Sequence, residues 1–247
     1  MTDYPVRATR KTFLIIENLA EMETAGVTEL ADRMDLSKSA VHNHLATLER
    51  LDIVINEDGR YRLGLRLLGL GMQARDGMDV MAAAPHMIDS LGTQSGELAS
   101  FVVPEFGMAV YMYLSADTSD QLRLGSRLPL HATAAGKAIL AFRTQDDPNS
   151  YITNYGLDAR TARTLTENGE FRTELQSVRD QGLAFDRGEV FTDRRAVAAP
   201  VRDSSEKPVG AVSVSGSADR LSGKRLEEDL SGMVLSAASE LQLEIRS

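Results

Sequence analysis

The stretch ELADRMDLSKSAVHNHLATLERLDIVINEDGRYRL, residues 29–63, decides how the first part of the chain folds. Thr28 is suited to cap a short helix, and Asp35-Leu36 follows that helix as a tight turn. The spacing of apolar residues then predicts a second helix from Ser37 to about Leu51. We expect its buried stripe to consist of Val41, Leu45, Leu48 and Leu51.

The opposite face of this second helix is polar and slender. It carries Ser39, His42, Asn43, Ala46 and Arg50. Small side chains with a few donors and acceptors allow a helix to enter the DNA major groove and to meet base edges. The pattern therefore predicts a helix-turn-helix whose second helix reads DNA.

His42 and His44 form a His-x-His pair of the kind found in metal sites. Residues two apart on an α-helix point about 200° away from each other, so the two rings cannot converge on one ion. We expect His44 to lie partly buried beside a helix contact and His42 to belong to the DNA-reading face. No metal site is predicted.

Residues 53–63 have the pattern of a two-strand hairpin with an Asp-Gly turn. Alternation along the second strand places Tyr61 and Leu63 inward and Arg60 and Arg62 outward, where arginines can contact phosphates. Helices followed by such a hairpin make a winged helix-turn-helix.

Upstream, residues 4–11 read as a basic arm. A helix of about fifteen residues is predicted next, and we expect Gly26 to end it. Its apolar positions are Phe13, Leu14, Ile16 and Leu19.

The charge of the chain is unevenly distributed. The net charge of −9 would oppose DNA binding if it were spread evenly over the 247 residues. Residues 1–75, however, hold 10 Lys and Arg against 11 Asp and Glu, which leaves 17 against 25 for the rest. The length suits two domains, and the chain has no cysteine and no apolar run that could span a membrane. We expect a soluble, cytoplasmic protein.

The second part begins with residues 65–75, which read as a connecting helix although Gly69 and Gly71 weaken it by roughly 1 kcal/mol each. A soft helix suits a hinge, and it equally suits packing in a dimer. A further helix is predicted near residues 81–91, followed by strands at residues 99–103, at residues 108–114 and from Arg123 onward.

The small-residue stretch HATAAGKA, residues 131–138, predicts an anion site. Thr133 can cap a helix there, and the small residues after it would leave the first-turn amides open to a carboxylate. The Gly136-Lys137 pair is not a P-loop, because His131 stands where the first glycine is required. We therefore expect a small acid as ligand and no cofactor.

The stretch VGAVSVSG, residues 209–216, has the alternation of a strand. Val212 and Val214 would face one side, and Ser213 and Ser215 the other. Buried hydroxyls need hydrogen-bond partners, so a pocket or ordered water is expected on the serine face.

Three blocks of the sequence, taken together, closely resemble the IclR family of transcriptional regulators. They are residues 29–51 with 58–71, LPLHATAAGKAILA at 128–141 and RAVAAPVRDSSEKPVGAVSVSG at 195–216. The resemblance implies an α+β protein with a winged helix-turn-helix at 1–64 and a connecting helix at 65–79. It also implies an α/β effector-binding and oligomerisation domain at 80–247, with a curved antiparallel, GAF-like sheet.

Such a protein would be a regulator, not an enzyme. The resemblance implies a homodimer or tetramer that binds a double-stranded DNA operator and responds to a small metabolite, often an organic acid. DNA contacts are then expected from Arg10, Ser37, Lys38, Ser39, His42, Asn43, Arg60 and Arg62. Effector contacts are expected from Leu128, Ala134, Ala135, Gly136, Asp186, Ala196, Ser213 and Ser215.

Two positions depart from the family pattern. Members often carry a basic residue at the position of Asn43, which is suited instead to bidentate contact with adenine. They usually carry a cysteine at the position of Ala196, where alanine leaves room for a larger ligand. The identity of the effector therefore does not transfer from relatives.

Two alternatives stay open. One is a hydrolase that uses Ser213 or Ser215 with His131 and Asp186, although VSVSG lacks the first glycine of the Gly-x-Ser-x-Gly motif. The other is a DNA-binding protein without any ligand.

Overall fold

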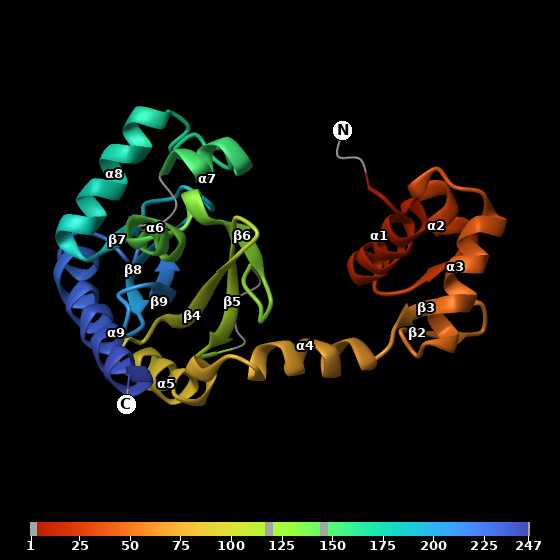
Figure 1. Cartoon of the computed structure of the whole chain (residues 1–247), viewed down its shortest axis with the longest axis horizontal. Coiled ribbons are helices and arrows are strands. Elements are labelled where there is room, and N and C mark those ends of the chain that lie inside the picture. Colours follow the sequence, from red (N-terminus) through yellow and green to blue (C-terminus); the bar gives the residue numbers. More distant parts are fainter. Residues whose placement is uncertain (1–3, 117–120, 144–147, 247) are drawn as a thin grey trace. The chain divides into compact units, whose positions relative to one another are not determined.

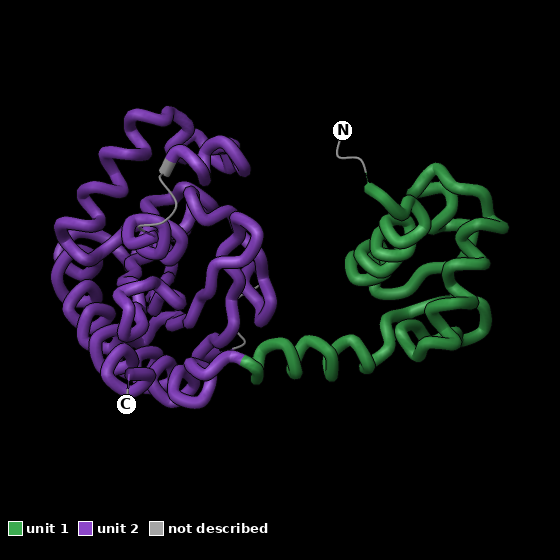
Figure 2. Tube along the Cα trace, viewed as in Figure 1, with its two compact units in different colours: residues 1–77 green, residues 78–247 purple. Residues whose placement is uncertain are grey.

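The computed structural model describes residues 4–116, 121–143 and 148–246 (Figure 1). The chain divides into two units, residues 1–77 and residues 78–247, each with its own core (Figure 2).

Helices and a small sheet build the first unit. Its described elements are α1 (Arg7–Met22), β1 (Ala25–Gly26), α2 (Val27–Met34), α3 (Lys38–Arg50), β2 (Val54–Glu57), β3 (Arg60–Leu63) and α4 (Arg66–Asp76). β2 and β3 form the expected hairpin, and β1 pairs antiparallel with the other edge of β3. The short strand β1 was not predicted, because two residues carry no readable periodicity.

The core of this unit lies where α1, α2 and α3 meet. Ile15, Leu19, Leu30, Val41 and Leu45 are fully buried there. Burial of each such side chain contributes about 1.5–3 kcal/mol, so the orientation of α3 about its own axis is strongly specified.

Most of the prediction for α3 is confirmed. Ser37 caps the helix, since its Oγ accepts a hydrogen bond from the amide of Ala40 at 3.2 Å. Asp35 makes the tight turn in the left-handed region, with φ of 50°. The prediction for Leu51 is wrong, because the helix ends at Arg50 and the Leu51 side chain is 49% exposed.

The predicted bounds of α1 are also wrong. The helix begins at Arg7, so residues 7–11 of the expected arm are helical, and it ends at Met22 instead of beside Gly26. Gly26 precedes α2, where its amide donates to Glu29 Oε2 at 2.7 Å, and Thr28 is therefore not the cap. Phe13 is 61% exposed, since the buried positions of α1 are Ile15 and Leu19.

The second unit is built around an antiparallel sheet. Its described strands are β4 (Leu98–Glu105), β5 (Met108–Leu114), β6 (Arg127–Pro129), β7 (Ala184–Asp186), β8 (Arg194–Arg202) and β9 (Pro208–Ser217), in the order β6-β5-β4-β9-β8-β7. Its described helices are α5 (Ala84–Ser95), α6 (Ala134–Phe142), α7 (Pro148–Tyr155), α8 (Asn168–Gln181) and α9 (Ser231–Arg246), with a π-helix at Arg225–Leu230. The curved antiparallel sheet with helices confirms the predicted fold class.

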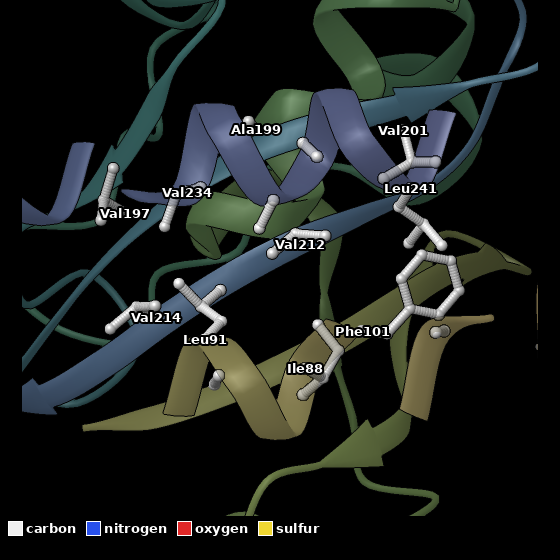
Figure 3. Packing of buried hydrophobic residues seen from close by; sticks show 14 of the residues in the cluster. Ile88, Leu91, Phe101, Val197, Ala199, Val201, Val212, Val214, Val234 and Leu241 are labelled. Atoms are coloured by element: carbon white, nitrogen blue, oxygen red, sulfur yellow. The ribbon is translucent and has the colours of Figure 1, made fainter. Parts of the chain in front are cut away.

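Helices cover both faces of this sheet. On one face, Phe101, Val212 and Val214 pack against α5 and α9 (Figure 3). On the other face, small residues such as Ala198 and Ala211 pack against α6. Burial on both sides explains why β8 and β9 read as apolar runs interrupted by a few polar residues.

Two predicted bounds in this unit need correction. The helix expected near residues 81–91 starts at Ala84, because residues 79–82 form a 3₁₀ turn and Pro85 sits in the first helical turn. The strand expected from Arg123 begins at Arg127, because Gly125, with φ of 81°, makes a turn before it. The strands at 99–103 and 108–114 are confirmed.

None of the described helices is long and apolar enough to cross a membrane.

Gly136 is the position in α6 most sensitive to size. A β-carbon there would lie 2.1 Å from the carbonyl oxygen of Leu130. We expect Gly136→Ala to lower the free energy of unfolding by about 1–3 kcal/mol through overpacking, measured by urea denaturation. The matched control is Gly232→Ala in α9, where the added methyl group meets nothing within 4 Å and the helix gains up to about 1 kcal/mol. Equal effects of the two substitutions would contradict the close approach of α6 to Leu130.

Candidate DNA-binding face and candidate effector site

The face of α3 that points away from the core is polar and exposed. Within the described parts of the chain, five of its side chains make no hydrogen bond or ion pair with protein: Lys38, Ser39, His42, Asn43 and Arg50. Ala46 beside them is half-buried. Donors and acceptors that protein groups leave unused are available to another molecule.

The two histidines of α3 have separate environments. His44 is half-buried, and its Nδ1 lies 2.8 Å from Oγ1 of Thr12 on α1. His42 is exposed on the polar face. The expected split of the His-x-His pair is confirmed.

The wing arginines point outward but are held by carboxylates. Arg62 lies 2.6 Å from Oε1 of Glu57, and this contact lowers the pKa of the Glu57 carboxyl. Arg60 lies 3.2 Å from Oε2 of Glu29 and donates to the backbone oxygen of Thr24. Each arginine would have to release or share its partner in order to neutralise a phosphate.

Arg10 differs from the wing arginines. Its guanidinium stacks over the Tyr4 ring, 5.2 Å from the centroid, and among the described residues it has no carboxylate partner. Ser37, by contrast, already uses its hydroxyl oxygen as the cap of α3.

Most residues of the candidate effector site lie on the sheet face that α6 covers. Antiparallel pairing aligns Asp186 with Ala196, Ala196 with Ser215, and Ser215 with Leu98 across four strands. The neighbouring row aligns Ala198 with Ser213 and Ser213 with Ser100. Leu128 is half-buried on β6 and pairs with Ala109. The structure thus brings Asp186, Ala196, Ser213 and Ser215 together, with Ser100 beside them.

Asp186 is a buried group, only 8% exposed, and not a solvated loop carboxylate. Its Oδ1 accepts hydrogen bonds from the amides of Gly188, at 2.9 Å, and Glu189, at 2.6 Å. Burial raises the pKa of this carboxyl in spite of those hydrogen bonds.

The two serines of β9 face away from Val212 and Val214, as expected. The Ser213 hydroxyl donates to the backbone oxygen of Val197 at 3.2 Å. Oγ of Ser215 accepts from the Arg194 guanidinium at 3.2 Å. Arg194 was not predicted as a site residue, although it precedes Ala196 by two and therefore shares its face.

The start of α6 offers less to an anion than the sequence suggested. Ala134, Ala135 and Gly136 are buried, and the Gly136 amide already donates to Oγ1 of Thr133 at 2.9 Å. The expectation that this amide is open is wrong, because the cap that starts the helix uses it. Only the Ala134 and Ala135 amides remain for the anion-site hypothesis.

A buried charged cluster lies behind this face, and the sequence interpretation missed it. Nζ of Lys137, 1% exposed, lies 2.5 Å from Oε1 of Glu189 and 2.9 Å from Oε1 of Glu174. Burial raises the pKa of Glu189 to about 7; Lys137 opposes this shift, and the neighbouring Asp186 and Glu174 add to it. The one available signal was a lysine inside an otherwise apolar and small-residue helix.

The hydrolase alternative finds no support in the geometry. Nδ1 of His131 lies 3.1 Å from the Tyr151 hydroxyl, and Nε2 lies 3.0 Å from the backbone oxygen of Asp158. Burial lowers the pKa of this imidazole. Both ring nitrogens are therefore engaged away from Ser213 and Ser215.

Comparison with known proteins assigns a family to both parts of the chain. Residues 8–57 match the IclR helix-turn-helix domain, and residues 72–243 match the C-terminal domain of the bacterial transcriptional regulator IclR. The chain is 31% identical over 229 residues to the HTH-type transcriptional regulator KdgR of Escherichia coli K12, covering 90% of this chain and 87% of that protein.

Solved structures agree in fold. The crystal structure of Thermotoga maritima IclR superposes with a TM-score of 0.80 at 25% identity, covering 97% of this chain and 98% of that one. An IclR homolog from Microbacterium hydrocarbonoxydans, solved in complex with 4-hydroxybenzoate, gives a TM-score of 0.76 at 19% identity, covering 90% and 91% of the two chains.

The cluster around Lys137 makes stability depend on pH. The pKa of Glu189 rises on folding from its ordinary value of 4.5 to about 7, so the folded state holds this proton more tightly than the unfolded chain. The stabilising contribution of the proton is full below about pH 4.5 and is lost as the pH rises through about 7. We expect Glu189→Gln to remove this decline, measured as the slope of the unfolding free energy against pH.

The slope is compared with that of Glu240→Gln, which removes an exposed carboxylate of α9 and should keep the wild-type slope. Wild-type and Glu189→Gln proteins with identical slopes between pH 4.5 and 7 would show that Glu189 is ionised throughout this range.

Proposed function

The chain belongs to the IclR family of transcriptional regulators, and we propose that its operator affinity is changed by a small organic acid bound in the second unit. The observation that carries the DNA-binding half of this proposal is the exposed polar face of α3. Its buried stripe fixes which side faces outward, and five polar side chains on that side make no hydrogen bond or ion pair within the described protein.

Different residues of α3 are proposed to contact the bases and the phosphates of DNA. Asn43 can offer a donor and an acceptor at once to adenine, and His42 and Ser39 flank it. Lys38 and Ser37 at the start of the helix are suited to phosphate contact, as helix N-termini generally are. Arg10, Arg60 and Arg62 would add sequence-independent phosphate contacts.

The effector half of the proposal is supported by the serine face of β8 and β9. Ser213, Ser215 and Asp186 place hydroxyl and carboxylate groups beside the small side chain of Ala196. Leu128 and the start of α6, including Gly136, would form its apolar wall. We propose that 4-hydroxybenzoate, the ligand of the Microbacterium homolog, is a useful probe, and not that it is the effector of this protein.

We further propose that the protein is a homodimer or a tetramer of such dimers. α4 buries none of its residues in the described chain, while Leu65 is 78%, Leu68 59% and Leu70 51% exposed. An apolar helix surface of this kind needs a partner, and a second copy would place two recognition helices over two related half-sites. The proposed domain division remains 1–64, 65–79 and 80–247.

The proposal predicts different roles for α3 and for the wing. DNA sites selected from a random duplex pool provide the specific target. On that target, Asn43→Ala should weaken binding by about 1–3 kcal/mol and relax preference at one base position. Arg62→Ala should weaken binding to all sequences and reduce the salt dependence by about one phosphate contact.

The control for the wing is Glu57→Gln, which frees Arg62 from its carboxylate and should tighten binding to random DNA. The recognition face would be misassigned if Asn43→Ala and Arg62→Ala changed specific and random binding by the same factor.

The proposal also predicts linkage between the two units. A panel of keto acids, sugar acids, aromatic acids, neutral sugars and amines is screened by thermal shift on the full chain. An effector at 100 times its Kd should stabilise the protein by about 2.7 kcal/mol. The same compound should change operator affinity by about 5- to 150-fold. If no acid in the panel raises the melting temperature or alters DNA binding, the organic-acid hypothesis fails.

A further inference from the structure

Arg194 has an unusual position for a cation. It lies on the serine face of β8, is half-buried, and donates one hydrogen bond, to Oγ of Ser215. Among the residues that the structure describes, no carboxylate lies within ion-pair distance of it. Several other arginines of the same unit have either a glutamate partner, as Arg127, Arg187, Arg202 and Arg220 do, or a backbone carbonyl oxygen, as Arg163, Arg179, Arg195 and Arg225 do.

A cavity of about 660 Å³ opens beside Arg194. Leu98, Arg194 and Ser215 contribute to its wall from the serine face, Asp89 and Thr93 line it from α5, and Glu97 lines it from the residue before β4. Asp89 accepts a hydrogen bond from the Tyr113 hydroxyl at 3.0 Å. Arg220 also lines the cavity, but its Nε and Nη2 donate to the Glu97 carboxylate at 3.0 and 2.9 Å. The volume falls within the usual range of small-molecule sites, and Arg194 is the arginine of its described lining that has no carboxylate partner.

The chemistry of this guanidinium favours a carboxylate. Arginine has five N–H donors in a fixed planar fork, and one hydrogen bond to Ser215 leaves most of them unused. A partly desolvated cation without a counter-ion is costly, and a bidentate carboxylate offsets that cost with two charge-assisted hydrogen bonds.

The far part of the same sheet face favours a hydroxyl group. The hydroxyls of Ser100, 3% exposed, and Tyr111, 7% exposed, have no hydrogen-bond partner in the described chain. Burial, and secondarily Asp186, raises the pKa of Tyr111, which therefore stays a neutral donor. Asp186 lies diagonally across the β7–β8 pair from Arg194, at about 7–8 Å by strand geometry, and would repel a second carboxylate there.

We infer that Arg194 binds the carboxylate of the effector and that the effector is a small monocarboxylic acid carrying at least one hydroxyl group. This inference rests on the proposed sensing function of the second unit. Arg194 would be the residue that selects acids over the corresponding neutral compounds.

The test measures binding to the full chain by calorimetry, with lactate, gluconate and 4-hydroxybenzoate as probes and the primary amide of each as its neutral counterpart. We expect at least one acid to bind, and Arg194→Gln to weaken it about 10- to 100-fold, as expected for the loss of charge-assisted hydrogen bonds. The amide should bind wild type and Arg194→Gln equally weakly. Arg194→Lys, which keeps the charge but not the fork, should fall between the two.

The control is Arg123→Gln, which removes an exposed arginine of the same unit and should leave binding unchanged. Arg194→Gln should not lower the melting temperature of the ligand-free protein, whereas loss of a purely structural residue would lower it. An acid that binds Arg194→Gln as tightly as wild type overturns the assignment of Arg194. A different outcome is that none of the three acids binds while neutral sugars or amines change the melting temperature and the DNA affinity. In that case the second unit does sense a ligand, but the ligand is not an acid and Arg194 does not bind its carboxylate.

Discussion

The packing of α3 against α1 and α2 is the constraint on which the first unit depends. Val41, Leu45 and Leu48 recur at helical spacing, and their burial leaves only one rotational setting of the helix about its axis. That setting places the polar side chains between them together on the outward face of the helix. The same sixteen residues, 36–51, therefore specify both the buried core contacts of the helix and its candidate DNA-binding surface.

In the second unit, burial also decides which way side chains point, but with the two-residue alternation of a strand. β8 and β9 are covered on both faces, so apolar residues dominate both, and each polar exception becomes conspicuous. Asp186, Arg194, Ser213 and Ser215 are such exceptions, and strand pairing collects them on one face. Each of the four makes at least one hydrogen bond within the chain, but the Arg194 guanidinium keeps donors without a partner in the described protein, which is why it points to a ligand site.

The spacing of apolar residues predicted the features that depend on spacing alone. The hairpin, α3, the alternation of β9 and the split of His42 from His44 follow from residue spacing alone. The bounds of α1, α5 and β6 did not follow, because local turns at residues 23–26, 79–82 and around Gly125 set them. Contacts between residues far apart in sequence could not be predicted either, such as the ion pair of Lys137 with Glu189. For the same reason, the sequence did not show that Arg194 has no carboxylate beside it in the described chain.

The exposed face of α3 is proposed to enter the major groove. Because the chain has no cysteine, a single His42→Cys substitution can carry an iron chelate that cleaves nearby DNA. Cuts are then expected to centre on two related half-sites about one helical turn apart, or a multiple of it, and the same chelate on Ser239→Cys in α9 should give none. Cleavage from Ser239→Cys but not from His42→Cys, or no focused cleavage from either, would contradict this proposal.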